Sequence, residues 1–300
     1  MIREVDLIIT TKNRIKELLF TIEKMRSIGF QENQIFIVDD ASSDDTFQTI
    51  RHRYPGIVIK KNLTQKGLIA NRNFLMRSTS RNFVLSLDDD SNIRSSTDLE
   101  EALELLNGNK SFGIFTFRPF EQLQAPPARE NLSDQILLVK TFIGCGHILK
   151  RELIHKLGDY REEFEFYCEE LDYSLRAFKF GYKVVMKENL VVHHRIDWNL
   201  RNSQFDSDLS RGVYGGVWRS TLGFSNNLMV TLIYYPFPFD LFFIVRYIWR
   251  RTVKFLIIKK DIYGFFGGLK RFIKFIPYSL HNRDSLSIRE FFIWIRLKSY

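Results

Sequence analysis

Short apolar runs alternate with helix-like segments through residues 1–118, and this alternation constrains the fold more than any other feature. The runs have the length of buried strands, and between them apolar side chains recur at helical spacing. Strands that alternate with helices predict a parallel, wound α/β sheet. The predicted strands are 5–10, 34–40, 56–61, 82–87 and 112–117, and the predicted helices are 15–25, 42–54, 67–78 and 97–107.

Acidic residues follow two of these strands, at the point where each strand ends. Asp39 and Asp40 close the second strand, and "SLDDDSN" places Asp88, Asp89 and Asp90 after the fourth. Ligands of a wound sheet bind beyond the carboxyl ends of its strands, so both groups should face one crevice. Carboxylates this close raise one another's pKa. A metal ion, a basic side chain or water should therefore lie among them.

The chain beyond the fifth strand contains a polar segment and an acidic helix. Residues 119–134 are polar and contain proline, which indicates a loop. An apolar stripe predicts a helix at 169–180, with Glu169, Glu170 and Asp172 in its first turn. Acids at that position complement the helix dipole, which explains them without any catalytic role.

The last sixty residues are basic and aromatic. They hold thirteen Lys or Arg against three acids, whereas residues 1–240 hold 31 basic and 32 acidic side chains. Fifteen aromatic residues are interleaved with these charges, which favours an anionic membrane surface over nucleic acid. The stretch 228–245 has the length of a bilayer span. Its two prolines and Asp240 instead favour a re-entrant or interfacial helical hairpin.

Cysteine usage and the N-terminal residues indicate a cytoplasmic location. Cys145 and Cys168 do not suggest a disulfide framework or a zinc site, so a reducing compartment is expected. The first residues show no charged segment followed by an apolar one, and no signal peptide is expected. The length of 300 residues allows one large domain or two.

Five separated stretches, in a common order, resemble the inverting family 2 glycosyltransferases, which have the GT-A fold. The first half of the resemblance consists of a Thr-x-x-Asn-Arg turn, an acid motif for nucleotide binding and an Ala-x-Arg-Asn stretch. A DxD motif and a Gly-Cys-Gly turn with the acidic helix complete it. In order, the stretches are "IITTKNR" (8–14), "VDDASSDDT" (38–46), "NLTQKGLIANRN" (62–73), "SLDDDSN" (86–92) and residues 144–182.

The resemblance implies a donor site and a metal site for Mn²⁺ or Mg²⁺. Asp40 would accept a hydrogen bond from a pyrimidine base, and Arg72 would lie near the base or the diphosphate. The metal would be held by Asp88, Asp90 and His193, with His194 close behind as the histidine ligand; these are ligand types that such cations accept. The residues implied to bind the donor are Thr10, Asn13, Arg14, Asp40, Arg72, Asp88 and Asp89.

The resemblance also implies an acceptor side. Gly144 and Gly146 would allow the backbone to approach the ligand closely. Inversion needs a general base that deprotonates the acceptor hydroxyl. Glu170 is the best match to the family base and Glu169 is the second choice. Asp172 would hold the helix start or orient an arginine such as Arg176.

These features predict a GT-A catalytic domain at 1–200, with a nucleotide-sugar half at 1–118 and an acceptor half at 135–200. A helical, membrane-associating region would follow at 201–300. The expected enzyme lies at the cytoplasmic face of the cell membrane. It moves a sugar from a UDP- or dTDP-sugar to a hydroxyl of a lipid-linked glycan in cell-surface polysaccharide synthesis. The sugar, the acceptor and the oligomeric state stay open.

Three other functions share some of these sequence features. A sugar nucleotidyltransferase would share the wound sheet and the metal acids, but it usually has a Gly-rich basic loop after the first strand, and "TTKNRIKE" has no glycine. A non-catalytic module that binds nucleotide sugars or membranes would be expected to lack the metal acids or the base. Nucleic-acid binding is permitted by the basic tail, but no recognition motif supports it.

Overall fold

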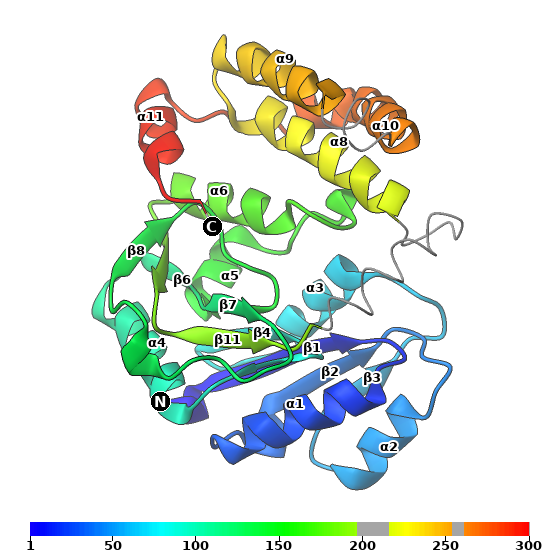
Figure 1. Cartoon of the computed structure of the whole chain (residues 1–300), viewed down its shortest axis with the longest axis vertical. Helices are drawn as coiled ribbons and strands as arrows, with labels where there is room; N and C mark the ends of the chain where they lie inside the picture. The colour runs from blue at the N-terminus through cyan, green and yellow to red at the C-terminus, as the bar shows by residue number, and fades with distance from the viewer. Residues whose placement is uncertain (197–215, 254–260, 300) are drawn as a thin grey trace. The chain divides into compact units, whose positions relative to one another are not determined.

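The computed structural model describes residues 1–196, 216–253 and 261–299 (Figure 1). The chain divides into two compact units. One comprises Met1–Tyr160, Arg176–Asp197 and Lys298–Tyr300, and the other comprises Arg161–Leu175 and Trp198–Leu297. The predicted domain boundary near residue 200 falls in 197–215, outside the described residues. The short segment 161–175, which was assigned to the catalytic domain, groups with the C-terminal helices.

A mixed eight-stranded sheet forms the centre of the first unit (Figure 1). Its strands are β1 (Val5–Thr11), β2 (Ile35–Asp39), β3 (Val58–Lys61), β4 (Phe83–Asp88), β6 (Phe112–Thr116), β8 (Ile136–Val139), β9 (Gly146–Lys150) and β10 (Lys183–Lys187). The strand order is β3-β2-β1-β4-β9-β6-β10-β8. The four strands β3 to β4 in this order are parallel, as predicted. The sheet as a whole is mixed, because β9, which was not predicted as a strand, runs antiparallel to both β4 and β6.

The helices of the first half lie where the apolar spacing predicted them. They are α1 (Ile15–Ser27), α2 (Thr46–Arg53), α3 (Leu68–Ser78) and α4 (Ser96–Gly108). In the second half, α6 (Glu169–Lys179) lies at its predicted place, and α5 (Arg151–Leu157) was not predicted. Strand β1 is buried along almost its whole length, as expected for a central parallel strand. Its side chains share one hydrophobic core with apolar residues of α1 and α4. This packing fixes the carboxyl ends of β1, β2 and β4 at one edge.

A second, three-stranded sheet in the first unit was not predicted. It consists of β5 (Ser91–Ile93), β7 (Arg118–Glu121) and β11 (Val191–His194). Strand β11 lies in the middle, antiparallel to β5 and parallel to β7. The predicted loop 119–134 therefore begins with a strand. The register pairs His194 with Ser91, so the histidines of β11 lie beside the chain that follows the three acids.

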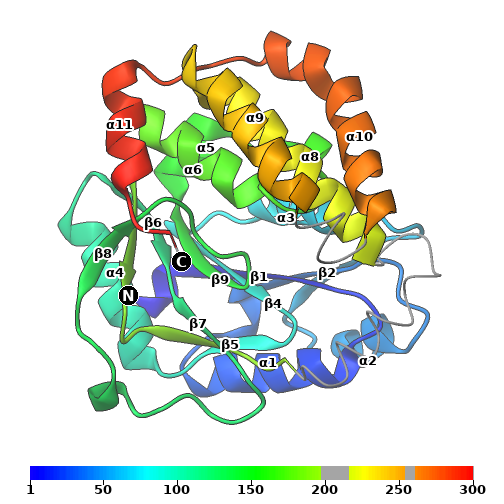
Figure 2. The same cartoon turned by 45° about the horizontal axis from the view of Figure 1, so that its top comes forward.

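The described part of the second unit is helical. Its helices are α8 (Gly216–Tyr234), α9 (Phe239–Thr252), α10 (Ile262–His281) and α11 (Ile288–Arg296), together with the start of α6. Helices α9 and α10 both pack along α8 (Figure 2). The stretch 228–245 is divided between α8 and α9, because Pro236 and Pro238 interrupt it. None of the described helices is long and apolar enough to span a bilayer. The first residues of the helical region predicted at 201–300 lie outside the described residues.

Candidate donor and metal site

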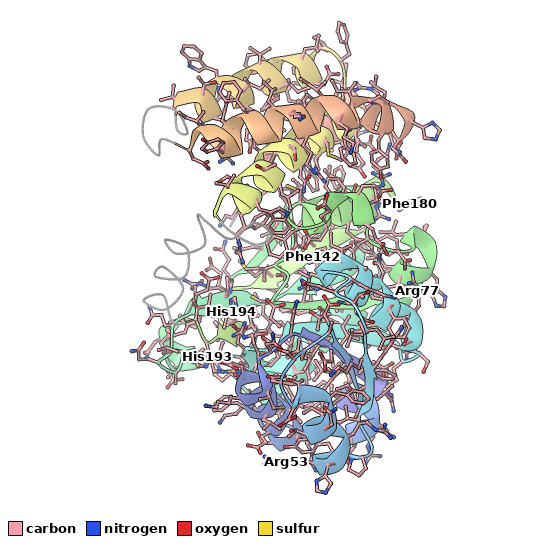
Figure 3. All side chains as sticks on the ribbon, turned by 90° about the vertical axis from the view of Figure 1, so that its right-hand side faces the viewer. Arg53, Arg77, Phe142, Phe180, His193 and His194 are labelled. Carbon is pink, nitrogen blue, oxygen red and sulfur yellow. The ribbon has the colours of Figure 1, made fainter. Side chains whose placement is uncertain are left out.

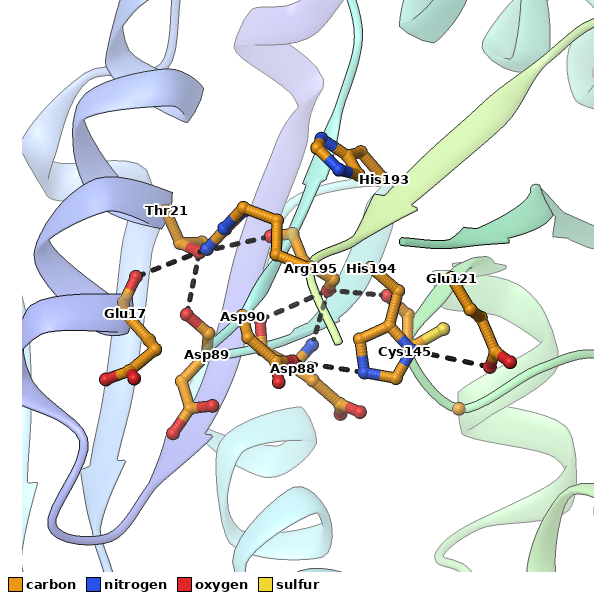
Figure 4. Close-up of polar contacts among 12 residues, drawn as sticks. Glu17, Thr21, Asp88, Asp89, Asp90, Glu121, Cys145, His193, His194 and Arg195 are labelled. Carbon is orange, nitrogen blue, oxygen red and sulfur yellow. Dashed lines mark hydrogen bonds and ion pairs between the residues drawn. The ribbon is translucent and has the colours of Figure 1, made fainter. Parts of the chain in front are cut away.

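The three acids that follow β4 are neutralised by arginines (Figure 4). Nη1 of Arg14 lies 3.2 Å from Oδ1 of Asp89, and its Nη2 lies 2.6 Å from Oδ2 of Asp90. Nη2 of Arg72 lies 3.0 Å from Oδ1 of Asp88. The negative charge of the three adjacent carboxylates is therefore balanced by basic side chains. Both arginines were expected to contact the donor, and the structure brings both to the acids.

Asp89 is tied to the neighbouring strand and helix. Its Oδ2 accepts a hydrogen bond of 2.8 Å from the Thr11 hydroxyl, and its backbone carbonyl accepts one of 2.7 Å from Thr21. Burial raises the pKa of Asp89, and Arg14 and Thr11 oppose this effect. Its side chain serves protein contacts, and its predicted contact with the donor stays a prediction.

The structure brings His194, and not His193, to the carboxylates. The two residues are neighbours on β11 (Figure 3), and their rings point to opposite faces of the strand (Figure 4). Nε2 of His194 lies 3.2 Å from Oδ1 of Asp90. Nε2 of His193, the preferred ligand in the sequence analysis, instead lies 2.9 Å from the carbonyl oxygen of Gln122. The second choice of histidine therefore has the geometry of a ligand.

Asp88, Asp90 and His194 fit a divalent cation. One ligand atom from each lies within 4.8 Å of the others. Oδ1 of Asp90 and Nδ1 of His194 are buried and lack a well-formed hydrogen bond, although each has an ionisable neighbour within 4 Å. Two carboxylates and one imidazole suit Mn²⁺, whereas Mg²⁺ prefers oxygen ligands alone.

The same three residues form a strongly polarised cluster. Burial lowers the pKa of His194, but its contacts with Asp90 and Cys145 outweigh this effect and raise the pKa above its usual range. Burial likewise raises the pKa of Asp90, and His194 and Arg14 more than reverse the change. Asp90 is therefore a carboxylate at neutral pH, which is the form that binds a cation.

Asp40 and Asn13 hold the loops at this edge of the sheet. The Asp40 carboxylate accepts hydrogen bonds from the Asn62 amide at 2.9 Å and from the backbone N–H groups of Lys66 and Gly67 at 2.8 and 2.9 Å. Burial opposes these bonds, but together they lower the pKa of Asp40. Asn13 accepts a hydrogen bond of 2.7 Å from the Ser43 N–H. Both residues were expected to contact the donor, and both shape the loops beyond β1 and β2.

Two further predicted residues lie beside the acids. Thr10, half-buried near the end of β1, pairs in register with Asp88. Arg72 is only 3% exposed, so it is not a solvated charge on the surface of α3. Its Nη2 also donates a 2.9 Å hydrogen bond to the carbonyl of Gly144. Arg72 therefore links the acids to the Gly-Cys-Gly turn.

The Gly-Cys-Gly turn has a packing reason for its second glycine. A Cβ on Gly146 would lie 2.7 Å from Cγ1 of Val192, so β11 approaches too closely for any side chain. Cys145 between the glycines is buried, and burial raises the pKa of its thiol. This is the opposite of what a thiol nucleophile needs. Acceptor contacts of Gly144 and Gly146 stay a prediction.

The acids of α6 differ in burial. Glu169 is buried, Glu170 is half-buried and Asp172 is fully buried. Oδ1 of Asp172 accepts hydrogen bonds from Nη1 of Arg161 at 2.8 Å and from the Tyr234 hydroxyl at 2.7 Å. These bonds suit Asp172 to holding the helix start. Glu169 and Glu170 stay the two candidates for the base.

Arg195 was missed in the sequence analysis. Its side chain donates to Oδ1 of Asn92 and to the Thr21 hydroxyl, and its backbone N–H donates to the carbonyl of Asp90 at 2.9 Å. It thus joins β11, β5 and α1 around the acids (Figure 4). Its place directly after the two histidines in "VVHHRID" is the signal that could have revealed it.

Three solved structures with a similar fold contain a nucleotide or a nucleotide sugar. The mannosyltransferase PcManGT of Pyrobaculum calidifontis, in complex with GDP-Man and Mn²⁺, has a TM-score of 0.58 and 12% identity, over 97% of this chain and 78% of that one. S. aureus TarS 1–349 in complex with UDP-GlcNAc has a TM-score of 0.60 and 14% identity, over 93% and 81%. GalNAc-T7 with UDP, GalNAc and Mn²⁺ has a TM-score of 0.61 and 13% identity, over 92% and 57%.

A comparison with curated protein sequences gave no match. The sequence model of "Glycosyl transferase family 2" matches residues 6–158, which is more than half of the chain. The matched segment contains β1 to β9, the three acids and both arginines that pair with them. The fold is the GT-A fold that the resemblance implied, and the chain belongs to glycosyl transferase family 2.

Proposed function

We propose that this glycosyltransferase moves a sugar from a UDP- or dTDP-sugar, with inversion, to a hydroxyl of a lipid-linked glycan in cell-surface polysaccharide synthesis. The observation that carries the proposal is the group of Asp88, Asp90 and His194 at the end of β4 in a family 2 chain. The complexes of PcManGT with GDP-Man and Mn²⁺ and of TarS with UDP-GlcNAc support a nucleotide-sugar donor. Membership of the family makes the nucleotidyltransferase alternative the weaker one.

In the proposed reaction, different residues bind the cation, position its ligands and take the proton of the acceptor. A divalent cation held by Asp88, Asp90 and His194 would supply positive charge to the diphosphate as it leaves. Arg14 and Arg72 hold the carboxylates in place through their ion pairs. In the proposed step the acceptor oxygen bonds to the anomeric carbon as the bond to the diphosphate breaks. Glu170 takes the proton of the hydroxyl, and attack opposite the leaving group inverts the configuration.

A screen of nucleotide sugars tests the donor. With Mn²⁺ present, a UDP- or dTDP-sugar at about one hundred times its Kd should raise the Tm by about 5 °C, because binding to the native state alone stabilises it. EDTA should remove most of the shift, and the matching nucleoside should give little. If GDP-sugars alone stabilise the protein, the proposal of a pyrimidine nucleotide in the donor is wrong. If no nucleotide sugar does so with Mn²⁺, the donor proposal fails.

We also propose that α9 docks on the anionic cytoplasmic face of the membrane. Leu241, Phe242, Val245 and Trp249 recur at helical spacing and are 53–69% exposed. Arg246 and Arg250 are exposed beside them. An apolar helix face flanked by arginines suits a lipid interface, since apolar side chains enter it while guanidinium groups meet lipid phosphates. The charge complementarity favours anionic lipid as the occupant.

Vesicle binding tests this surface without removing the helices. The full chain with both Phe242→Ser and Trp249→Ser should bind vesicles of phosphatidylglycerol and phosphatidylcholine at least about tenfold more weakly, because two exposed aromatic side chains lose their burial in the interface. Phe180→Ser is the control, since Phe180 is an exposed aromatic of the first unit. Equal binding by the double variant and the control, or no binding by the unmodified chain at low salt, would overturn the proposal.

A further inference from the structure

We infer that Asn226 and Arg271, far from the acidic helix in sequence, are positioning residues for its first turn. This inference rests on the proposed function, in which Glu170 or Glu169 in that turn is the general base. All the residues that carry it belong to the second unit. Nothing in the motifs of the sequence pointed to either residue.

The backbone that enters α6 is strained. Glu165, Tyr167 and Cys168 have positive φ values of 58°, 69° and 70°, and none of them is glycine. Residues with a Cβ adopt this conformation at a cost and keep it only where the surroundings fix it. The helix begins at the next residue, Glu169. Whatever holds this segment therefore also sets where the first turn of α6 lies.

Asn226 of α8 holds the segment through its side-chain amide. Its Nδ2 lies 2.7 Å from the carbonyl oxygen of Phe164 and 2.9 Å from those of Phe166 and Tyr167. The two hydrogens of one amide are thus shared among three carbonyls of one strained turn. Asn226 is fully buried, so these contacts form away from competing water.

Arg271 of α10 fixes the Asn226 amide and reaches the same segment. Its Nη1 donates to Oδ1 of Asn226 at 2.7 Å, which directs the Nδ2 of that amide to the carbonyls. Its Nη2 donates to the carbonyl of Glu163 at 2.6 Å and lies 3.0 Å from a carboxylate oxygen of Glu165. One guanidinium therefore joins α10, α8 and the strained turn, which a lysine could not do with the same geometry.

The close packing of α10 on α8 makes this reach possible. A Cβ on Gly268 would lie 2.6 Å from Cδ1 of Phe224, so the two helices approach as closely as glycine allows. The rings of Phe224 and Phe265 stack with their centroids 5.2 Å apart. Gly268 precedes Arg271 by about one turn of α10. Gly268 in "YGFFGGLKR" thus has a structural reason linked to the arginine.

Helix α8 also contacts the acidic helix α6 itself, about two turns after Asn226. Tyr234 donates the 2.7 Å hydrogen bond to Asp172, and eight residues separate it from Asn226 along α8. Residues eight apart lie near one face of a helix. One face of α8 therefore holds the chain before Glu169 and the helix after Glu170. The C-terminal helices would set the base in place as well as carry any membrane surface.

Three single variants of the full chain test the positioning. Asn226→Ala and Arg271→Ala should speed amide hydrogen exchange at 164–172 by at least about tenfold. They should slow release of nucleoside diphosphate from the donor found in the screen by about ten- to a hundredfold, since a base displaced by about 1 Å loses that much. UDP–Mn²⁺ affinity should stay within about twofold. Asn227→Ala should change none of these, because the Asn227 amide donates to the carbonyl of Gly223 within α8 and, among the described residues, has no hydrogen bond to the strained turn.

A double-mutant cycle separates positioning from general destabilisation. In a Glu170→Gln chain, Arg271→Ala should slow the reaction by less than about threefold more, because the base through which it acts is already lost. If Glu169→Gln is the variant that stops transfer, the cycle is made with that change instead. Effects that multiply in full in the cycle with the base, or normal hydrogen exchange and rate in both Asn226→Ala and Arg271→Ala, would overturn the inference. Arg271→Ala carries the test alone if Asn226→Ala does not fold. If neither Glu170→Gln nor Glu169→Gln slows the reaction, the proposal that one of them is the general base fails. The hydrogen-exchange rates still show whether Asn226 and Arg271 hold the strained turn.

Discussion

Replacing Glu170 by glutamine should slow sugar transfer by roughly two to four orders of magnitude, the usual contribution of a general base. Glutamine keeps the size and much of the hydrogen-bonding shape of the side chain but cannot accept the proton. Nucleotide and Mn²⁺ affinity should stay near normal, because a group that acts only in the transition state affects kcat more than binding. Single-turnover transfer together with titration calorimetry of UDP and Mn²⁺ separates the two quantities.

Glu169→Gln is the matched comparison for this result. Glu169 is buried and Glu170 is half-buried at the start of the same helix, so Glu170 has the better access to an acceptor hydroxyl. We therefore expect Glu169→Gln to be the milder change. If it stops transfer while Glu170→Gln does not, the two roles are exchanged. If both variants keep transfer within about tenfold, or about 1.4 kcal/mol of barrier, the base lies elsewhere.

Local patterns explain why the parallel half of the sheet could be predicted. Strand β1 lies at Val5–Thr11 against a prediction of 5–10, and β4 at Phe83–Asp88 against 82–87. An apolar run that ends in polar residues carries its own boundaries. The direction of β9 could not be predicted in this way, because a strand buried on both faces reads alike in either orientation. Its direction follows from contacts with β4 and β6, distant in sequence.

The choice between His193 and His194 shows the same limit within the site. Successive side chains of a strand point to opposite faces, so only one histidine can face the carboxylates. Which one does so depends on register, and a shift by one residue exchanges the faces. The register of β11 is set by its pairing with β5. Strand β5 has three residues, too few for a hydrophobic pattern in the sequence to predict it. The sequence could identify the two histidines as candidate ligands, but it could not show which of them faces the carboxylates.

The sequence identified Arg14 and Arg72 as donor-binding residues, and the structure adds ion pairs with the carboxylates after β4. Both were expected near the donor, and both are ion-paired with the acids after β4. Asn226 and Arg271, in contrast, have no local signal, because both hold the strained turn through backbone carbonyls of residues 163–167. Any residue offers a backbone carbonyl, so the sequence around the turn gives no sign that an amide is needed there.

Loss of the Asp90 carboxylate should abolish metal-dependent nucleotide binding and leave the fold intact. Asp90 shares the candidate metal site with Asp88 and His194. Its removal should not strand a buried charge, because Arg14 is 42% exposed on its side chain and keeps its contact with Asp89. With Asp90→Ala, UDP affinity in Mn²⁺ should fall at least about a hundredfold, to the value measured in EDTA. The Tm without Mn²⁺ checks the fold.

The two histidines of β11 test the geometry of the same site. His194→Ala should weaken Mn²⁺ binding by about ten- to a hundredfold or more, because it removes an imidazole 3.2 Å from Asp90. His193→Ala should leave it within about twofold, since that ring contacts the Gln122 carbonyl on the other face of the strand. The reverse order would mean that β11 pairs one residue out of the register seen here. Equal weakening of UDP binding with and without Mn²⁺ by Asp90→Ala would mean that Asp90 serves the nucleotide or the loop, and the cation would need other ligands.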